Sequence, residues 1–113
     1  MTHPKRGEIW LVGFDPSVGT EMRKTRPALI ISNDISNAKS SKVTLLPMTS
    51  TIREMPIVVI VEPDKQNGLD KTSLIRVPDV TTFDKGRLKK RVGILKAGAI
   101  KEVEARLKLH LGL

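Results

Sequence analysis

The chain has 113 residues, which is the size of one domain, and we expect a single domain over residues 1–113. It contains no cysteine, so disulfide bonds and metal sites built on thiolates are excluded. Twenty Lys and Arg against twelve Asp and Glu give a net charge of +8. This excess predicts attraction to polyanions, RNA and DNA first and anionic membrane surfaces second, although a basic surface can also serve solubility alone.

The apolar stretches ALII and IVVIV are too short to cross a bilayer. The first ten residues, MTHPKRGEIW, have a basic start but lack the apolar core of a signal peptide. We therefore expect a cytoplasmic protein that has no membrane partner.

Runs of apolar and β-branched residues, separated by polar links, predict strands along most of the chain. Pro47 predicts a bulge or an edge position in the third strand, because proline cannot donate to a ladder. The pair Asn67-Gly68 marks a turn within a loop over 64–73. The strands are expected at 7–14, 27–32, 42–50, 56–63 and, interrupted at Pro78, 73–83.

The last part of the chain predicts helices. Asp84 is expected to cap a short basic helix over 84–91, before a small strand at 92–95. A closing helix is predicted by four apolar residues that repeat at spacings of 3, 4 and 4 and so share one face, namely Ile100, Val103, Leu107 and Leu111.

On the opposite side of this helix, Glu102 with Arg106 and Glu104 with Lys108 predict two ion pairs at the i,i+4 spacing. Gly112 stands where a C-terminal stop belongs. Five or six strands followed by a helix predict an α+β domain, a small curled antiparallel barrel with helices at one side.

Several kinds of chemistry are poorly supported by the residues. His3 and His110 lie at the two ends of the chain, and the acidic residues are scattered singly, so neither a two-histidine ribonuclease nor a metal site is indicated. The glycine-rich nucleotide-binding motifs are missing, so no cofactor is expected. Three aromatic residues cannot form an extended base-stacking platform, so RNA would have to be bound by arginine, hydroxyls and backbone.

The segment KRGEIWLVGFDPSVGTEMRKTRPALIISND resembles the N-terminal signature of the MazF/PemK (Kid) toxins, the ribosome-independent mRNA interferases of bacterial toxin–antitoxin pairs. The similarity continues through PMTST, SLIRV, TTFDKGRL and the closing helix, and so covers almost the whole chain. The resemblance implies an SH3-like β-barrel that forms a homodimer. It also implies cleavage of single-stranded RNA without a metal, leaving a 2′,3′-cyclic phosphate and a 5′-hydroxyl.

The resemblance implies a catalytic pair. Arg26 matches the arginine of the family's R-P motif, and Pro27 would hold it at the start of a strand. An arginine suits a phosphorane because its planar fork can bind two phosphate oxygens. Thr49, in PMTST, matches the family's catalytic threonine or serine. We expect these two side chains to meet one phosphodiester from neighbouring strands.

Further catalytic candidates depart from the family pattern. Arg76 matches an arginine that some members use as general acid or phosphate holder. The best-known members of that group have an aspartate where this chain has Pro78 and a histidine where it has Thr20, and many members have an arginine at Thr81. The version of the mechanism based on arginine and threonine is therefore favoured, and Glu21 or a bound water is the candidate base.

Contacts to RNA are expected from the segment that precedes Arg26 and from the end of the third strand, although a solvated hairpin tip is the alternative for the charged residues. The candidates are Gly19, Thr20, Arg23, Lys24 and Ser50. The resemblance also implies an antitoxin whose acidic C-terminal segment covers the same groove. Two other functions stay open: a non-catalytic SH3-like nucleic-acid-binding domain, and a toxin homologue that acts on a protein such as DNA gyrase.

Overall fold

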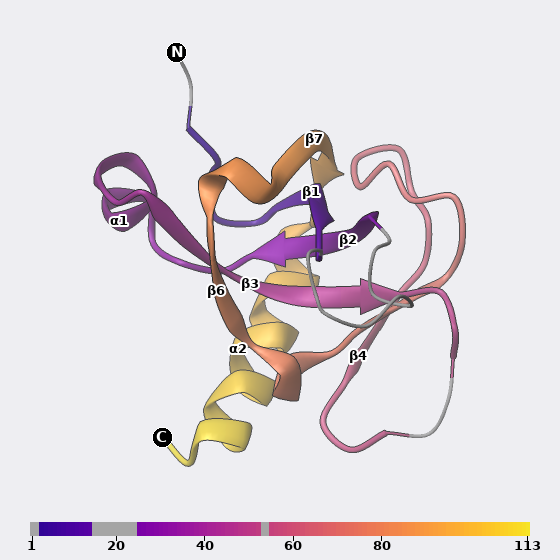
Figure 1. Ribbon diagram of the computed structural model, residues 1–113. Helices are drawn as coiled ribbons and strands as arrows, with labels where there is room; N and C mark the ends of the chain where they lie inside the picture. Colours follow the sequence, from indigo (N-terminus) through magenta and orange to yellow (C-terminus); the bar gives the residue numbers. More distant parts are fainter. Residues whose placement is uncertain (1–2, 15–24, 53–54) are drawn as a thin grey trace.

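The computed structural model describes residues 3–14, 25–52 and 55–113, and these residues form seven strands and two α-helices (Figure 1). Two short 3-10 turns, η2 (Val77–Asp79) and η3 (Lys85–Arg87), join strands in the second half. The helices are α1 (Asp34–Lys39) and α2 (Ala97–Leu111). The strands are β1 (Glu8–Gly13), β2 (Thr25–Ile30), β3 (Lys42–Thr49), β4 (Val59–Val61), β5 (Ser73–Ile75), β6 (Thr81–Asp84) and β7 (Leu88–Ile94).

The strands form a curled antiparallel sheet in the order β4-β5-β3-β2-β1-β7, and β6 pairs with β3. The long strand β3 has different neighbours along its length: 42–45 pair with β6, and 48–49 pair with β5. Because β6 continues through η3 into β7, the chain passes from the side of β3 to the side of β1, and β7 runs along the top of the view beside β1 (Figure 1). The predicted curled antiparallel fold with a C-terminal helix is confirmed.

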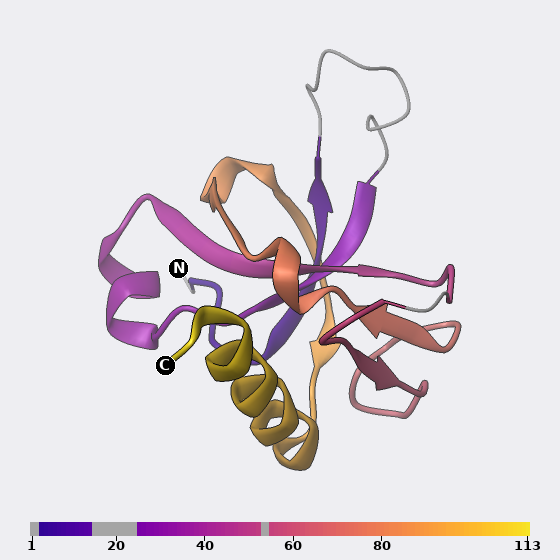
Figure 2. The ribbon, with the colours of Figure 1, turned by 90° about the horizontal axis from the view of Figure 1, so that it is seen from below.

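Side chains of the central strands alternate between two apolar clusters, as the period of a strand requires. The first cluster contains Ile9, Leu29 and Leu46, and α2 covers it through Val103, which is 2% exposed (Figure 2). The second cluster lies on the other face and contains five buried residues, bordered by all three aromatic side chains of the chain. Its buried members are Val12, Ala28, Ile30, Val43 and Leu45.

Pro47 lies in the middle of β3, and the expectation of an edge position is wrong because β3 has neighbours on both sides. Its carbonyl accepts a hydrogen bond from the backbone N–H of Arg76, on the β5 side. A strand residue directs its N–H and C=O to the same side. The edge of β3 that lacks the N–H of Pro47 is therefore the edge on which β3 changes partner, from β6 at Leu45 to β5 at Met48. Because Pro47 lies between these two pairings, no hydrogen bond of either ladder is lost.

Three expectations about helices are corrected. The basic helix expected over 84–91 is the single turn η3, and the rest of that segment is strand because it pairs with β1 and β3. In α2, Leu111 is 51% exposed, since the helix has by then passed beyond the sheet. Glu104 pairs with Arg6 at 2.7 Å and not with Lys108.

The close packing of the loop 64–70 against β7 gives a stability prediction. A Cβ built on Gly93 would lie 2.4 Å from the backbone of Asn67, whereas one on Gly98 in α2 meets nothing within 4 Å. Gly93→Ala is therefore expected to lower the free energy of unfolding by about 2 kcal/mol. Gly98→Ala should leave it unchanged or raise it by about 0.5 kcal/mol. Urea denaturation of both variants would contradict the packing if they had equal midpoints.

Candidate active site

Arg26 and Thr49 lie at the same end of neighbouring strands. The recorded pairs between β2 and β3 are Ala28–Pro47, Leu29–Leu46 and Ile30–Leu45. If this register continues two residues beyond the Ala28–Pro47 pair, Arg26 lies opposite Thr49. The two residues that the sequence singled out therefore come from adjacent strands, at the point where the recorded ladder between them ends.

Both side chains belong to the face of the sheet that carries the second cluster. Arg26 pairs with Val12 on β1, and directly opposed residues of antiparallel strands share a face. Val12 is fully buried in the second cluster. Thr49 lies four residues after Leu45 and six after Val43 along β3, so it shares the face of these two members of the cluster. Arg26 and Thr49 thus lie on the same face of the sheet, next to the apolar residues of the second cluster.

The Arg26 side chain is half-buried on β2. Within residues 3–14, 25–52 and 55–113, its guanidinium has no recorded hydrogen bond or ion pair. The next residue, Pro27, has a fixed φ and lies within the same strand, so the backbone that bears the guanidinium is held in place. A held guanidinium offers five N–H donors in one plane, which suits the oxygens of a phosphate.

The Thr49 hydroxyl already has one partner. Its Oγ1 accepts a hydrogen bond from the backbone N–H of Thr51 at 3.1 Å, which fixes the position of the oxygen at the end of β3. The hydroxyl hydrogen can still be donated to another acceptor, such as a phosphate oxygen or a ribose hydroxyl. Ser50, between these two residues, is exposed.

Arg76 follows β5, on the side of β3 away from β2. Its Nε lies 2.8 Å from Oδ2 of Asp79, although the two atoms are not aligned for a hydrogen bond. The family pattern has its aspartate at the position of Pro78, and here the next residue carries the carboxylate instead. Much of the charge of Arg76 is therefore balanced within the chain, in contrast to that of Arg26.

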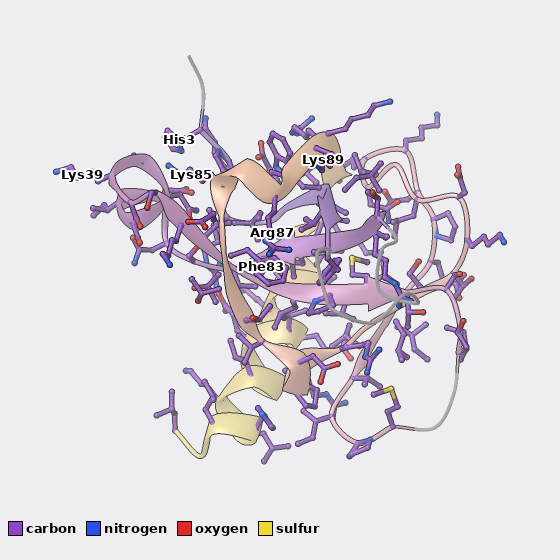
Figure 3. All side chains as sticks on the ribbon, viewed as in Figure 1. His3, Lys39, Phe83, Lys85, Arg87 and Lys89 are labelled. Carbon is purple, nitrogen blue, oxygen red and sulfur yellow. The ribbon has the colours of Figure 1, made fainter. Side chains whose placement is uncertain are left out.

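Five of the candidate residues lie outside the described part of the chain: Gly19, Thr20, Glu21, Arg23 and Lys24. The described residue nearest to the start of that segment is Phe14, whose ring meets Phe83 edge-on with 5.3 Å between centroids. Arg87 lies 4.8 Å above the Phe83 ring and donates to the carbonyl of Gly13 at 3.2 Å. Figure 3 shows Phe83 and Arg87 side by side in front of β2 and β3. Their contacts with Phe14 and Gly13 hold the end of β1 beside the candidate site.

Sequence reasoning missed a buried carboxylate at the start of β1. Glu8 is only 9% exposed, and its Oε1 accepts from the backbone N–H of Lys5 and from Nε1 of Trp10, each at 2.9 Å. Its Oε2 accepts from Nε of Arg91 at 2.9 Å. Although burial raises the pKa of Glu8, the hydrogen bonds from Trp10, Lys5 and Arg91 together lower it below its ordinary value of 4.5. The signal available in the sequence was the spacing of Glu8 and Trp10 on one strand face.

A hollow of about 500 Å³, here called the β7 hollow, opens between the β1–β2 pair, β7 and the loop before β5. Pro27 and Ser50 contribute to its wall, and each directly follows one member of the candidate catalytic pair. Pro27 pairs with Leu11, so the hollow lies on the face of β1 and β2 opposite to Arg26. No sequence signal placed the loop 64–71 beside β7.

Two further properties concern the described residues alone. In that part of the chain, His, Asp and Glu side chains nowhere gather in groups of three or more that could hold a metal ion. Its helices are also too short or too polar to cross a membrane.

Residues 5–111 match the family described as PemK-like, MazF-like toxin of type II toxin–antitoxin system. A relative named Endoribonuclease MazF, from Staphylococcus saprophyticus, is 36% identical over 110 residues, which are 96% of this chain and 92% of that protein. A structure of MazF from Deinococcus radiodurans superimposes with a TM-score of 0.83 at 24% identity and full coverage of both chains. An endoribonuclease in complex with its cognate antitoxin, from a mycobacterial species, has a TM-score of 0.80 at 25% identity, over 97% of this chain and 96% of that one.

The Glu8 network predicts how stability depends on pH. Because the folded pKa of Glu8 is lowered, its carboxylate stabilises the fold fully above pH 4.5, and this contribution is lost as the pH falls from there through the folded pKa. Glu8→Gln should lower the free energy of unfolding at pH 7 by about 2 kcal/mol. Urea denaturation between pH 7 and pH 3 should show the two proteins converging below pH 4.5.

The control for this measurement is Glu102→Gln on the exposed side of α2, where the ion pair with Arg106 is 4.0 Å long. Its effect should stay below about 0.5 kcal/mol at every pH. A difference between wild type and Glu8→Gln that stayed constant with pH would show that the charge of Glu8 does not stabilise the fold.

Proposed function

Since this chain belongs to the PemK-like, MazF-like toxins of type II toxin–antitoxin systems, it is an endoribonuclease, and we propose that it cuts single-stranded mRNA at specific sequences without a metal ion. The observation that carries the proposed chemistry is the shared face and shared strand end of Arg26 and Thr49. It supports a site in which one phosphodiester contacts both side chains.

In this proposal the nucleophile is the 2′-hydroxyl of the RNA itself. Its oxygen attacks the adjacent phosphorus, the new P–O2′ bond forms and the P–O5′ bond breaks. The products are a 2′,3′-cyclic phosphate and a 5′-hydroxyl. The protein has to align the two oxygens, remove one proton, return one to the leaving oxygen and stabilise the added negative charge of the phosphorane.

Arg26 stabilises the added negative charge of the phosphorane, since its guanidinium makes no other hydrogen bond or ion pair among the described residues. It binds the two non-bridging oxygens and gains in interaction energy as their charge grows. Thr49 donates its hydroxyl hydrogen to a phosphate oxygen or orients the 2′-hydroxyl, from an oxygen that Thr51 already holds. The base that accepts the 2′ proton is Glu21 or a bound water, as the sequence suggested.

Arg76 takes a supporting role in this scheme. Its contact with Asp79 balances its charge and fixes its direction, which suits a residue that holds the substrate more than one that transfers a proton. The candidate RNA-binding residues Gly19, Thr20, Arg23 and Lys24 come directly before β2 in the chain and would bring the substrate backbone to Arg26. Ser50 follows Thr49 and would contact the next nucleotide.

Two partners belong to the proposal. The mycobacterial endoribonuclease was solved with its cognate antitoxin, which supports an antitoxin for this chain as well. With a net charge of +8, the surface suits an acidic, extended antitoxin segment that lies where RNA binds. A homodimer is supported by large apolar side chains left exposed on β4 and at the end of α2.

The catalytic pair can be tested by RNA cleavage in EDTA. Arg26→Ala should reduce kcat/KM by about 100-fold or more, because the phosphorane loses its cation. Thr49→Ala should cost about tenfold or more, whereas Thr49→Ser keeps the hydroxyl and should retain most of the activity. Arg106→Ala, on the exposed side of α2, removes the same charge far from the site and is the control.

Undiminished cleavage by both alanine variants would remove this active site. Loss of wild-type cleavage in EDTA would overturn the metal-free mechanism. If the wild type bound RNA in a salt-sensitive way without cutting it, the chain would be a binding module and not a nuclease.

Competition tests the shared groove. An acidic peptide that matches the C-terminal segment of the cognate antitoxin should displace a fluorescent RNA from the Arg26→Ala variant, which is expected to cut the RNA slowly. The displacement should weaken as salt is added, because both ligands depend on charge. Simultaneous binding, with the affinity for RNA unchanged by saturating peptide, would show that the two surfaces are separate.

A further inference from the structure

We propose that the β7 hollow binds one nucleotide of the RNA strand that flanks the scissile phosphate, and that it thereby contributes to the choice of cleavage sequence. The inference rests on the proposed function, because it assumes that the scissile phosphate lies between Arg26 and Thr49. It adds a second binding surface, and of the residues that form it the sequence had suggested only Ser50 as a contact to RNA.

The position of the hollow is the first argument. Pro27 and Ser50 line it, and they are the immediate chain neighbours of Arg26 and Thr49. Successive residues of a strand point to opposite faces, so the hollow begins where the candidate catalytic face ends. A strand of RNA whose phosphate touches Arg26 and Thr49 can therefore turn round the end of β2 and β3 and place a neighbouring nucleotide in the hollow.

The lining suits a nucleobase. Leu11 and Pro27 from the β1–β2 pair, with Leu69 from the loop and Val92 from β7, offer apolar contact to a base. Around them stand polar groups that can meet base edges and a phosphate, namely Ser50, Asp70, Lys71 and Lys90. The volume of about 500 Å³ lies within the range of small-molecule sites, about 300–1,000 Å³.

The outer wall of the hollow is preformed. Asn67 is fully buried, and its Oδ1 accepts from the backbone N–H groups of Asp64 and Leu69 at 3.1 and 3.0 Å. Its Nδ2 donates to the carbonyl of Glu62 at 2.9 Å. The loop is joined to β7 by the hydrogen bond from Ile94 to Gln66. A wall ordered in advance costs little conformational entropy when a ligand binds.

The charges of the hollow fit a nucleotide better than an uncharged ligand. Lys71, Lys90 and Arg91 line the hollow, against one carboxylate from Asp70. Arg91 is paired with Glu8, so the two lysines are the cations that remain for a ligand. A phosphate that links the bound nucleotide to the next one gains from both lysines. The Asp70 carboxylate can only accept hydrogen bonds, so it distinguishes base edges that carry amino groups from edges that carry carbonyls.

The test combines a filled hollow with bases removed from the substrate. Leu11→Trp places a large ring into the hollow from a half-buried strand position, and circular dichroism checks that the variant is folded. Cleavage is measured on an oligonucleotide that the wild type cuts once, and on versions with an abasic nucleotide at each of the two positions on either side of the cut.

For the wild type, one of these four abasic substrates should lose about tenfold in kcat/KM, because a base contact is removed. With the intact substrate, Leu11→Trp should lower kcat/KM by about the same factor. For this variant, removing that base should then lower kcat/KM by less than a further factor of two. In parallel, Lys71→Gln should raise KM several-fold at low salt. Lys65→Gln is its matched control, an exposed lysine of the same loop that does not line the hollow, and should change KM less than twofold.

The proposal is overturned if the losses from Leu11→Trp and from the abasic nucleotides multiply at all four positions, or if Lys71→Gln and Lys65→Gln behave alike. If Leu11→Trp does not fold, the comparison of KM between Lys71→Gln and Lys65→Gln tests the proposal by itself. If the proposal is overturned but Arg26→Ala still lowers kcat/KM as expected, the proposed catalytic site stands and only the proposal for the hollow is wrong. Absence of cleavage by the wild type would reject the proposed function instead.

Discussion

The register between β2 and β3 is the constraint on which the candidate site depends. Ala28 opposite Pro47 and Leu29 opposite Leu46 fix which residues of the two strands meet at their common end. A shift by one residue would move every side chain of a strand to the other face, so Arg26 and Thr49 would no longer share one. The fully buried side chains of both clusters hold this register, because a slip would expose them. Apolar packing thus positions two polar groups that have little stabilising role of their own.

A second constraint acts on β3, which pairs with two different strands along one of its edges. It pairs with β6 along its first half and with β5 at its end, and Pro47 lies at the change of partner. The strand therefore extends beyond its pairing with β6, and it ends at Thr49, whose hydroxyl oxygen accepts a hydrogen bond from Thr51. On the opposite face, the buried side chain of Asn67 holds the loop that forms the β7 hollow. The two faces at this strand end thus have different chemistry, one cationic and hydroxylic, the other a mixture of apolar and charged side chains.

Local patterns in the sequence were informative where one short segment contained the whole signal. The strands around Ile9, Leu29 and Leu46 and the closing helix around Val103 were predicted because burial on one face imposes a period that is visible in a few residues. The basic run after Asp84 was misjudged as a helix, since its pairing with β1 is a contact between segments distant in the chain. Pro47 was misjudged for the same reason, because the change of partner along β3 cannot be read from its neighbours in the sequence.

By itself, the sequence determined the family, the curled antiparallel class of fold and the identities of Arg26 and Thr49 as candidates, because the motifs that carry them are contiguous. Only the tertiary structure decided that these two residues share a face, that Asp79 balances Arg76, and that Glu8 holds Trp10 and Arg91. It also decided that the loop around Asn67 encloses a hollow beside them. The physical reason is that most of these contacts join segments far apart in the chain. The near ones depend on local conformation: the strand places Glu8 and Trp10 on one face, and the turn η2 brings Arg76 to Asp79.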